Sequence, residues 1–268
     1  MTCFFVSLKL MIMTFYKYQG TGNDFVILDN RNQHFPKDNN PLIASLCDRH
    51  FGIGADGLIL LENDSTSDFK MVYYNADGNE STMCGNGGRC IVAFAKKLHL
   101  FEKTTIFLAI DGIHHAEIEN SIVSLQMIDV DEVKVSGNSI FADTGSPHHI
   151  EIVEHIEKYP VVEKGRKIRN EIYGKEGSNV NFIEQVDHQT FKIRTYERGV
   201  EDETLACGTG VTAAAIAMHA TKKTSSTTIK LSVVGGNLEV SFDENNGVYS
   251  NVILSGPAEF VFKGTINI

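Results

Sequence analysis

Two cysteines of this chain are each followed by a glycine-rich step and then by an apolar run. Residues 84–96 read CGNGGRCIVAFAK, and residues 207–219 read CGTGVTAAAIAMH. The polar residues around each cysteine favour a turn, and the residues after the glycines are typical of a helix. The sequence therefore predicts that Cys84 and Cys207 each stand at the N-terminus of a helix.

A thiol at a helix N-terminus has two chemical consequences. The unpaired N–H groups of the first turn bind anions such as carboxylates, and their partial positive charge lowers the pKa of the cysteine. If two such ends face one another, they can hold one carboxylate and present a thiol to each face of the neighbouring carbon. This geometry suits inversion of an amino-acid α-carbon without a cofactor, which needs a base, an acid and N–H donors that stabilise the carbanion.

Cysteines and glycine-rich turns of this kind also occur in other classes of protein. A single cysteine is most often a small buried hydrophobe, and this is our interpretation of Cys3, Cys47 and Cys90. Glycine-rich turns also bind phosphates, but neither segment matches GxxxxGK[ST] or GxGxxG after a strand. A thiol–disulfide oxidoreductase normally carries CxxC, which this chain lacks. A non-catalytic anion-binding module remains as the alternative from another functional class, and the presence of both thiols disfavours it.

The similarity of the two cysteine segments extends along the chain as an internal repeat. Cys84 and Cys207 are 123 positions apart (207 − 84), and the same offset aligns Thr21-Gly22 with Thr144-Gly145 and GADGLIL at 54–60 with GSNVNFI at 177–183. It also places Tyr73 on Tyr196 and Glu80 on Glu203. One offset that serves several segments indicates two related halves with the same order of elements.

Each half is rich in short β-like runs such as FVILDN, GLILLE, NVNFIEQV and TFKIRTYE, broken by Gly, Asn and Asp. Fewer segments are typical of helices: 41–50, 86–99, about 151–159 and 208–221. The last is apolar on nearly all sides, so we expect it to be buried. We predict an α+β fold of two pseudo-symmetric halves, each a curved, mostly antiparallel, barrel-like sheet around one central helix.

Composition limits the class of protein. The chain has 268 residues, 42% hydrophobic and 22% charged, with a formal net charge of −10, which argues against a nucleic-acid partner. No apolar run reaches the roughly 18–20 residues of a membrane span. We interpret residues 1–12, MTCFFVSLKLMI, as an extended or misassigned start. We therefore expect a cytoplasmic protein with reduced cysteines and no membrane partner.

Several motifs together resemble the diaminopimelate epimerase family: FYKYQGTGNDFVILDN, RHFGIGADGL, YNADGNESTMCGNGGRC, GSPHH, NVNF and YERGVEDETLACGTG. They occur in order across nearly the whole chain. The resemblance implies epimerisation between LL- and meso-2,6-diaminopimelate in the supply of lysine and peptidoglycan precursors, with neither cofactor nor metal. It also implies a homodimer. We place the first half at 13–128 plus 257–268 and the second half at 129–256.

The resemblance also implies roles for individual residues. Cys84 and Cys207 would be the acid–base thiols, with His148 and Glu197 tuning their pKa values. The helix ends would bind the α-carboxylate of the substrate through Gly85, Asn86, Gly208 and Thr209. The rest of the substrate would contact loop residues, namely Asn23, Asn75, Asn179, Glu197 and Arg198. Amides with one charge of each sign suit a substrate that carries an amino-acid group at each end.

Two positions depart from the family pattern. Gly57 stands where some members have Gln, and Ser146 stands where many have Asn, so both lose an amide near the substrate. Proline racemases and hydroxyproline epimerases share the thiol pair, and a racemase of this kind is the alternative within the fold. Those enzymes usually have His at the position of Asn86, which favours diaminopimelate here.

Overall fold

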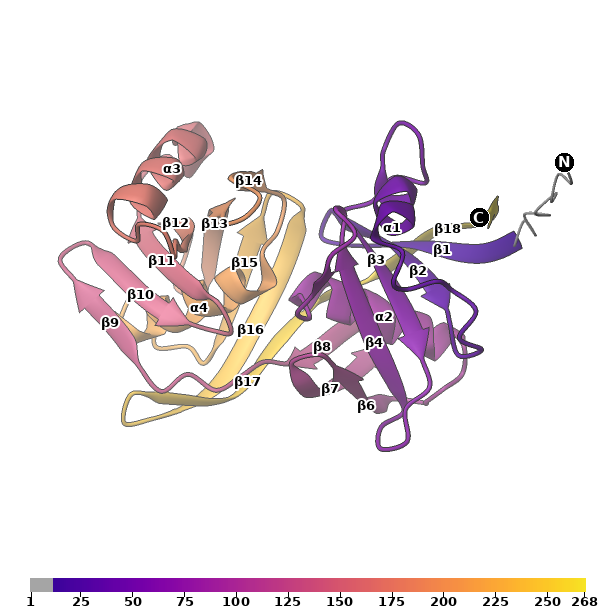
Figure 1. Cartoon of the computed structure of the whole chain (residues 1–268). Coiled ribbons are helices and arrows are strands. Elements are labelled where there is room, and N and C mark those ends of the chain that lie inside the picture. The colour runs from indigo at the N-terminus through magenta and orange to yellow at the C-terminus, as the bar shows by residue number, and fades with distance from the viewer. Residues whose placement is uncertain (1–11) are drawn as a thin grey trace, which may run out of the picture.

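A computed structural model describes residues 12–268. Cys3 and all but the last residue of the start predicted at 1–12 lie outside the described residues. Figure 1 shows two lobes, one made by the first half and one by the second half of the chain. Ten elements precede the crossing to the second lobe: β1 (Ile12–Gly20), β2 (Asn23–Asp29), α1 (Asn40–Cys47), β3 (Gly57–Glu62), β4 (Phe69–Asn75), β5 (Glu80–Ser81), α2 (Gly85–Lys97), β6 (Thr104–Ala109), β7 (Gly112–Glu119) and β8 (Ile122–Gln126).

The second lobe repeats this order of elements. It contains β9 (Val133–Ser136), β10 (Ser139–Asp143), β11 (Pro147–Ile152), the 3-10 turn η1 (Ile156–Lys158), α3 (Val161–Glu171), β12 (Asn179–Gln185), β13 (Thr190–Glu197), β14 (Asp202–Thr204), α4 (Gly208–Ala220), β15 (Thr228–Val233), β16 (Gly236–Asn245) and β17 (Val248–Pro257). The final strand, β18 (Glu259–Asn267), returns to the first lobe and pairs antiparallel with β1.

Strand pairing confirms the repeat and the α+β fold class predicted from the sequence. In the first lobe β2 pairs parallel with β3, and β4 pairs parallel with β6. In the second lobe β11 pairs parallel with β12, and β13 pairs parallel with β15. The other strand pairs are antiparallel.

Each lobe wraps its sheet around one central helix, α2 in the first and α4 in the second. Both helices are 13 residues long and begin directly after Cys84 and Cys207. Most of α4 is fully buried, including Ala213–Ala217, as its all-round apolarity predicts. One hydrophobic core contains side chains from both helices and from strands of both lobes, so the lobes share an apolar interior.

The lobes are also joined by a strand. β17 pairs antiparallel with β16 of the second lobe and with β8 of the first, from Ile253–Gln126 to Pro257–Ile122. Given this pairing and that of β18 with β1, we propose the same division of the chain as the sequence suggested, with 257–268 in the first half.

The helix predicted at about 151–159 is wrong. This segment ends strand β11, continues through η1 and is followed by α3, which the sequence analysis missed. The two valines and Gly165 give α3 a low intrinsic helix propensity. Packing stabilises it instead, because Val161 lies against β12 and β13, and Gly165 approaches Tyr196 so closely that a Cβ would stand 2.3 Å from the Tyr196 Cβ.

Candidate active site

The N-termini of α2 and α4 meet at two glycines. A Cβ on Gly85 would lie 3.5 Å from the Cα of Gly208, and a Cβ on Gly208 would lie 3.3 Å from the Cα of Gly85. Leu254 of β17 lies 3.0 and 3.1 Å from the same two Cβ positions. The absence of side chains therefore lets two helix ends, with their unpaired N–H groups, converge on one place.

Each of these helices is preceded by its cysteine in an extended backbone conformation. The Cys84 sulfur accepts a hydrogen bond from the Gly87 N–H at 3.2 Å and so caps α2. The Cys207 sulfur instead lies 3.5 Å from the Thr209 hydroxyl. The two thiols are thus held at equivalent positions by different partners.

A cavity of about 1170 Å³ lies between the two lobes and contains both cysteines. Eleven of the twelve residues assigned from the sequence line it: Asn23, Asn75, Cys84, Gly85, Asn86, Asn179, Glu197, Arg198, Cys207, Gly208 and Thr209. A smaller cavity of about 820 Å³ lies at the far end of α2, beside Lys97 and Phe260, and contains neither thiol.

The lowered thiol pKa expected from the helix ends is not found. Burial raises the pKa of Cys84 to about 11 and that of Cys207 to about 12. The Gly87 N–H acts against this at Cys84, and the Thr209 hydroxyl and Gly210 N–H act against it at Cys207. Desolvation of the thiolate therefore outweighs the hydrogen bonds of the helix N-terminus.

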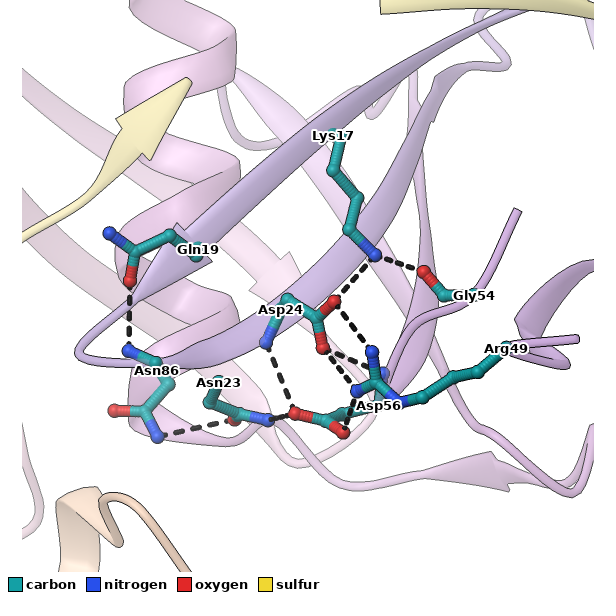
Figure 2. A network of polar contacts seen from close by, with 9 residues as sticks. Lys17, Gln19, Asn23, Asp24, Arg49, Gly54, Asp56 and Asn86 are labelled. Atoms are coloured by element: carbon teal, nitrogen blue, oxygen red, sulfur yellow. Dashed lines mark hydrogen bonds and ion pairs between the residues drawn. The ribbon is translucent and has the colours of Figure 1, made fainter. Parts of the chain in front are cut away.

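Asn23 is oriented by a network of charged side chains that Figure 2 shows. Its Nδ2 donates to the Asp56 carboxylate at 2.6 Å, and Arg49 binds both Asp56 and Asp24 at 2.6 and 2.7 Å. Lys17 pairs with Asp24 at 2.6 Å. Burial opposes ionisation of Asp24, but Arg49 and Lys17 hold its pKa at about 2. With its amide nitrogen occupied, Asn23 turns Oδ1 toward α2.

Asn86 connects this network to the second lobe. Its Nδ2 donates to Asn23 Oδ1 at 3.2 Å and to the Ala206 carbonyl at 3.0 Å, directly before Cys207. Its Oδ1 accepts from Arg89 at 3.0 Å. The side chain therefore spans the two lobes with all of its polar atoms bonded.

Glu197 is the last residue of β13 and Arg198 follows it, next to the start of β12. The Arg198 N–H donates to Asn179 Oδ1 at 2.9 Å, so the Asn179 Nδ2 is left to face the cavity. Arg198 also donates from Nη1 to the Glu176 carbonyl at 3.0 Å. Burial raises the pKa of Glu197, and nearby Asp56 acts in the same direction.

His148, for which the resemblance implies a role in tuning the thiol pKa values, is the one assigned residue that does not line the cavity. It is fully buried behind the cavity wall, and its Nε2 lies 3.0 Å from the Thr209 hydroxyl. Asn181 donates from Nδ2 to His148 Nδ1 at 3.1 Å, so this ring nitrogen is an acceptor and Nε2 carries the proton. Burial lowers the pKa of His148 to about 3, and Arg198 adds to this effect. A neutral His148 thus reaches Cys207 only through Thr209.

Three residues of the site were missed from the sequence. Asp56 stands at a turn before β3, and its GADG context could have identified it. Asn181 lies two residues after Asn179 on the same strand, hence on the same face, which is also a usable signal. Arg89 follows the glycines inside an apolar helix, and nothing in the sequence marks it as buried.

The two departures from the family pattern have different structural settings. A Cβ on Gly57 would lie 2.6 Å from both the Tyr73 ring and the Tyr74 carbonyl, so Tyr73 occupies the space that a side chain would need. Ser146 lines the cavity, with its hydroxyl 3.4 Å from the Thr209 hydroxyl. A hydroxyl thus lines the cavity at this position in place of the amide that is common in the family pattern.

Comparison of the sequence and fold with known proteins gives a consistent result. A sequence model described as "Diaminopimelate epimerase" matches residues 15–127 and 140–261, one segment in each lobe. A diaminopimelate epimerase of Flavobacterium psychrophilum is 62% identical over 256 residues, which cover 95% of this chain and 100% of that protein.

Solved structures with similar folds are much more distant in sequence. A Bacillus anthracis phenazine biosynthesis protein of the PhzF family has a TM-score of 0.77 at 13% identity and covers 96% of this chain and 100% of its own. A hydroxyproline epimerase from Agrobacterium vitis has a TM-score of 0.70 at 14% identity, with 96% and 93% covered. These structures share the fold, while the sequence matches carry the assignment: the chain belongs to the diaminopimelate epimerase family.

Proposed function

We propose that this protein is a cofactor-independent epimerase that interconverts LL-2,6-diaminopimelate and meso-2,6-diaminopimelate, supplying lysine and peptidoglycan precursors. The observation that carries the proposal is the convergence of two helix N-termini at Gly85 and Gly208, each with a cysteine directly before it. Family membership and 62% identity to a diaminopimelate epimerase over nearly the whole chain support the substrate.

The α-carboxylate of the substrate is the anion that these helix ends fit. N–H groups at Gly85, Asn86, Gly208 and Thr209 bind it and stabilise the negative charge that develops when the α-proton leaves. One cysteine, as thiolate, takes the α-proton and becomes a thiol. The other cysteine, as thiol, gives its proton to the opposite face and becomes a thiolate, so no proton is lost or gained overall.

The distal end of the substrate carries a second ammonium and carboxylate. Arg198 can form a bidentate pair with the carboxylate, and Glu197 can pair with an ammonium. The side-chain amides of Asn23, Asn75 and Asn179 line the same cavity and supply neutral hydrogen bonds. Hydrogen bonds fix the orientations of two of these amides: Asn23 donates to Asp56 and accepts from Asn86, and Asn179 accepts from the Arg198 N–H.

The thiol chemistry also supports a reducing compartment. The cysteines among residues 12–268, Cys47, Cys84, Cys90 and Cys207, are free thiols, and the proposed mechanism requires two of them to remain so. The cytoplasm provides this condition. Among residues 12–268 no helix is long and apolar enough to cross a bilayer.

The proposal includes a homodimer. Strand β18 pairs with β1 and, among the strands of residues 12–268, with no other. It exposes Phe260, Val261 and Phe262, an apolar run at a sheet edge that natural proteins usually cover. Sedimentation of the purified protein and of Val261→Asp tests this: a wild-type monomer would rule out the dimer.

A substrate panel tests the function. The protein, treated with a chelator and free of pyridoxal phosphate, is incubated with LL-diaminopimelate, L-lysine, L-proline and trans-4-hydroxy-L-proline, and loss of optical rotation is followed. We expect rapid change with diaminopimelate alone, since only this substrate uses both Arg198 and Glu197. Racemisation of a proline derivative without diaminopimelate turnover would assign the site to a proline-type racemase. No turnover of any compound would point to an anion-binding module.

A further inference from the structure

Arg89 is a fully buried arginine in the second turn of α2. Its guanidinium donates to the Gly85 carbonyl at 3.3 Å, to Asn86 Oδ1 at 3.0 Å and to the Thr21 hydroxyl at 3.2 Å. A longer contact of 3.4 Å joins Nε to the Pro257 carbonyl. The charge therefore lies beside the first turn of α2, directly behind the anion-binding end of the helix.

All of these acceptors are neutral. Among residues 12–268 no carboxylate forms an ion pair with Arg89, although the chain carries 34 acidic residues. Removing a guanidinium from water without a counter-ion costs several kcal/mol even after relaxation. Arginine does not avoid this cost by losing its proton at physiological pH. The arrangement is thus suited to an anion that is present only during function.

The second half of the chain has no such charge. The repeat places Thr212 at the position equivalent to Arg89 (89 + 123), and the Thr212 hydroxyl donates to the Gly208 carbonyl at 3.0 Å. Both residues therefore bond to the first carbonyl of their own helix, but only one brings a positive charge. The pseudo-symmetry of the two thiol sites is broken at this pair.

We propose that Arg89 is a positioning residue whose buried charge favours the thiolate of Cys84 over that of Cys207. The two proton carriers are then unequal. In the protein before turnover, Cys84 is the cysteine that ionises and acts as the base, and Cys207 stays protonated and acts as the acid. This protonation state matches one of the two substrate isomers. After turnover the charge has moved to Cys207, away from Arg89, so the reverse reaction begins from the less stable distribution.

Three other titratable groups lie near Cys84, and none of them lowers its pKa. Glu197 from β13 raises the pKa of both cysteines. Tyr73 from β4 and Cys90 from α2 also lie near Cys84, and burial raises the pKa of each so that both stay neutral. Arg89 lowers the pKa of Cys84, in the direction that the geometry requires.

The inference rests on the proposed role of Cys84 and Cys207, but it can be tested without turnover. The protein is alkylated with iodoacetamide at a series of pH values, and the modification of each cysteine is followed by peptide mass spectrometry. Alkylation requires the thiolate, so the midpoint of the rate against pH reports the pKa of each thiol regardless of its access. We expect Cys84 to have the lower midpoint in the wild-type protein. A lower midpoint for Cys207 would overturn the proposal whether or not the protein is an epimerase.

Variants then assign the difference to Arg89. Arg89→Met keeps the length and removes the charge, and we expect the Cys84 midpoint to rise by about one pH unit. This corresponds to about tenfold slower alkylation of Cys84 below both midpoints. Arg89→Lys keeps the charge, so its rate of Cys84 alkylation should be close to that of the wild-type protein. Thr212→Val, the matched change in the other half, and Thr21→Val, which removes one guanidinium partner, should leave the Cys84 midpoint in place.

Two outcomes of the variant series contradict the proposal. The first is an unchanged Cys84 midpoint in Arg89→Met whose circular dichroism and melting match the wild type. The second is an equal rise at Cys84 and Cys207, which would indicate a general change in the cavity. If Arg89→Met does not fold, the Arg89→Lys protein and the wild-type order of the two midpoints still decide the question.

Discussion

Asn86 of the first half donates a hydrogen bond from Nδ2 to the carbonyl of Ala206 in the second half, over 3.0 Å. The acceptor is the residue directly before Cys207, and the donor lies two residues after Cys84. One side chain thus links the backbone segments that carry the two thiols on opposite sides of the cavity.

Both thiols are required for epimerisation, because each face of the α-carbon needs its own proton carrier. Cys84→Ala and Cys207→Ala should each reduce kcat by at least about 10²-fold, the usual size of an acid–base contribution. The measurement is the initial rate of loss of optical rotation from LL-diaminopimelate. Cys47→Ala, at a buried cysteine outside the cavity, serves as control and should remain active. Near wild-type activity of either site variant would exclude a two-base mechanism.

The two-base geometry also determines where solvent hydrogen appears. The thiol on the product side carries a proton exchanged with solvent, whereas the abstracted proton leaves on the other sulfur. In D₂O, product formed during early turnover should contain deuterium at the α-carbon, and recovered substrate should contain almost none. Mass spectrometry of the separated isomers measures both. Equal labelling of the two pools would instead indicate a single base.

Arg198 should select the substrate by its distal end. Arg198→Leu removes a charge-assisted contact of about 1.5–3 kcal/mol, which corresponds to a loss of roughly 10- to 150-fold in kcat/KM for diaminopimelate. Trace activity on lysine, which lacks a distal carboxylate, should change little. The measurement is kcat/KM for diaminopimelate and for lysine with the same protein preparation, which separates a loss of distal binding from a general loss of activity. An equal loss on both would place Arg198 at the reacting carbon or in the fold.

His148 should make the protein sensitive to acid. Its pKa is about 3 in the folded protein against an ordinary 6.5, so the unfolded chain binds the proton more readily between these values. The free energy of unfolding should therefore fall as pH decreases below 6.5, by about 1.4 kcal/mol per pH unit from this residue. Urea titrations from pH 7 to pH 5 measure the slope. His148→Asn should make the slope shallower by up to this amount, and an unchanged slope would contradict the buried neutral state.

The sequence predicted the repeat and both central helices, because these features depend on local patterns, and eleven of the residues assigned by resemblance line the cavity. The position of Cys84 and Cys207 before Gly-x-Gly and an apolar run is a helix-start signal that survives in both halves. The missed helix α3 lacks such a signal. Its sequence, VVEKGRKIRNE, is held helical by packing on Tyr196 and its neighbours, and contacts between distant segments cannot be read from propensity.

The thiol pKa values show the same limit in the site. A helix N-terminus is visible in the sequence, and it lowers a cysteine pKa. The depth of the cavity is not visible, and burial raises the pKa of Cys84 and Cys207 by a larger amount. The indirect position of His148 behind Thr209 likewise depends on how β11 packs against α4, which a motif such as GSPHH does not encode.

The path of the chain between the lobes has a mechanical consequence. The backbone crosses between them twice, after β8 and between β17 and β18, and the antiparallel pairing of β8 with β17 lies beside both crossings. Both covalent tethers between the lobes therefore lie beside one ladder, so a force that parts the lobes at the cavity is resisted there by non-covalent contacts alone. Among those contacts are the hydrogen bond from Asn86 to the Ala206 carbonyl and the close approach of Gly85 to Gly208.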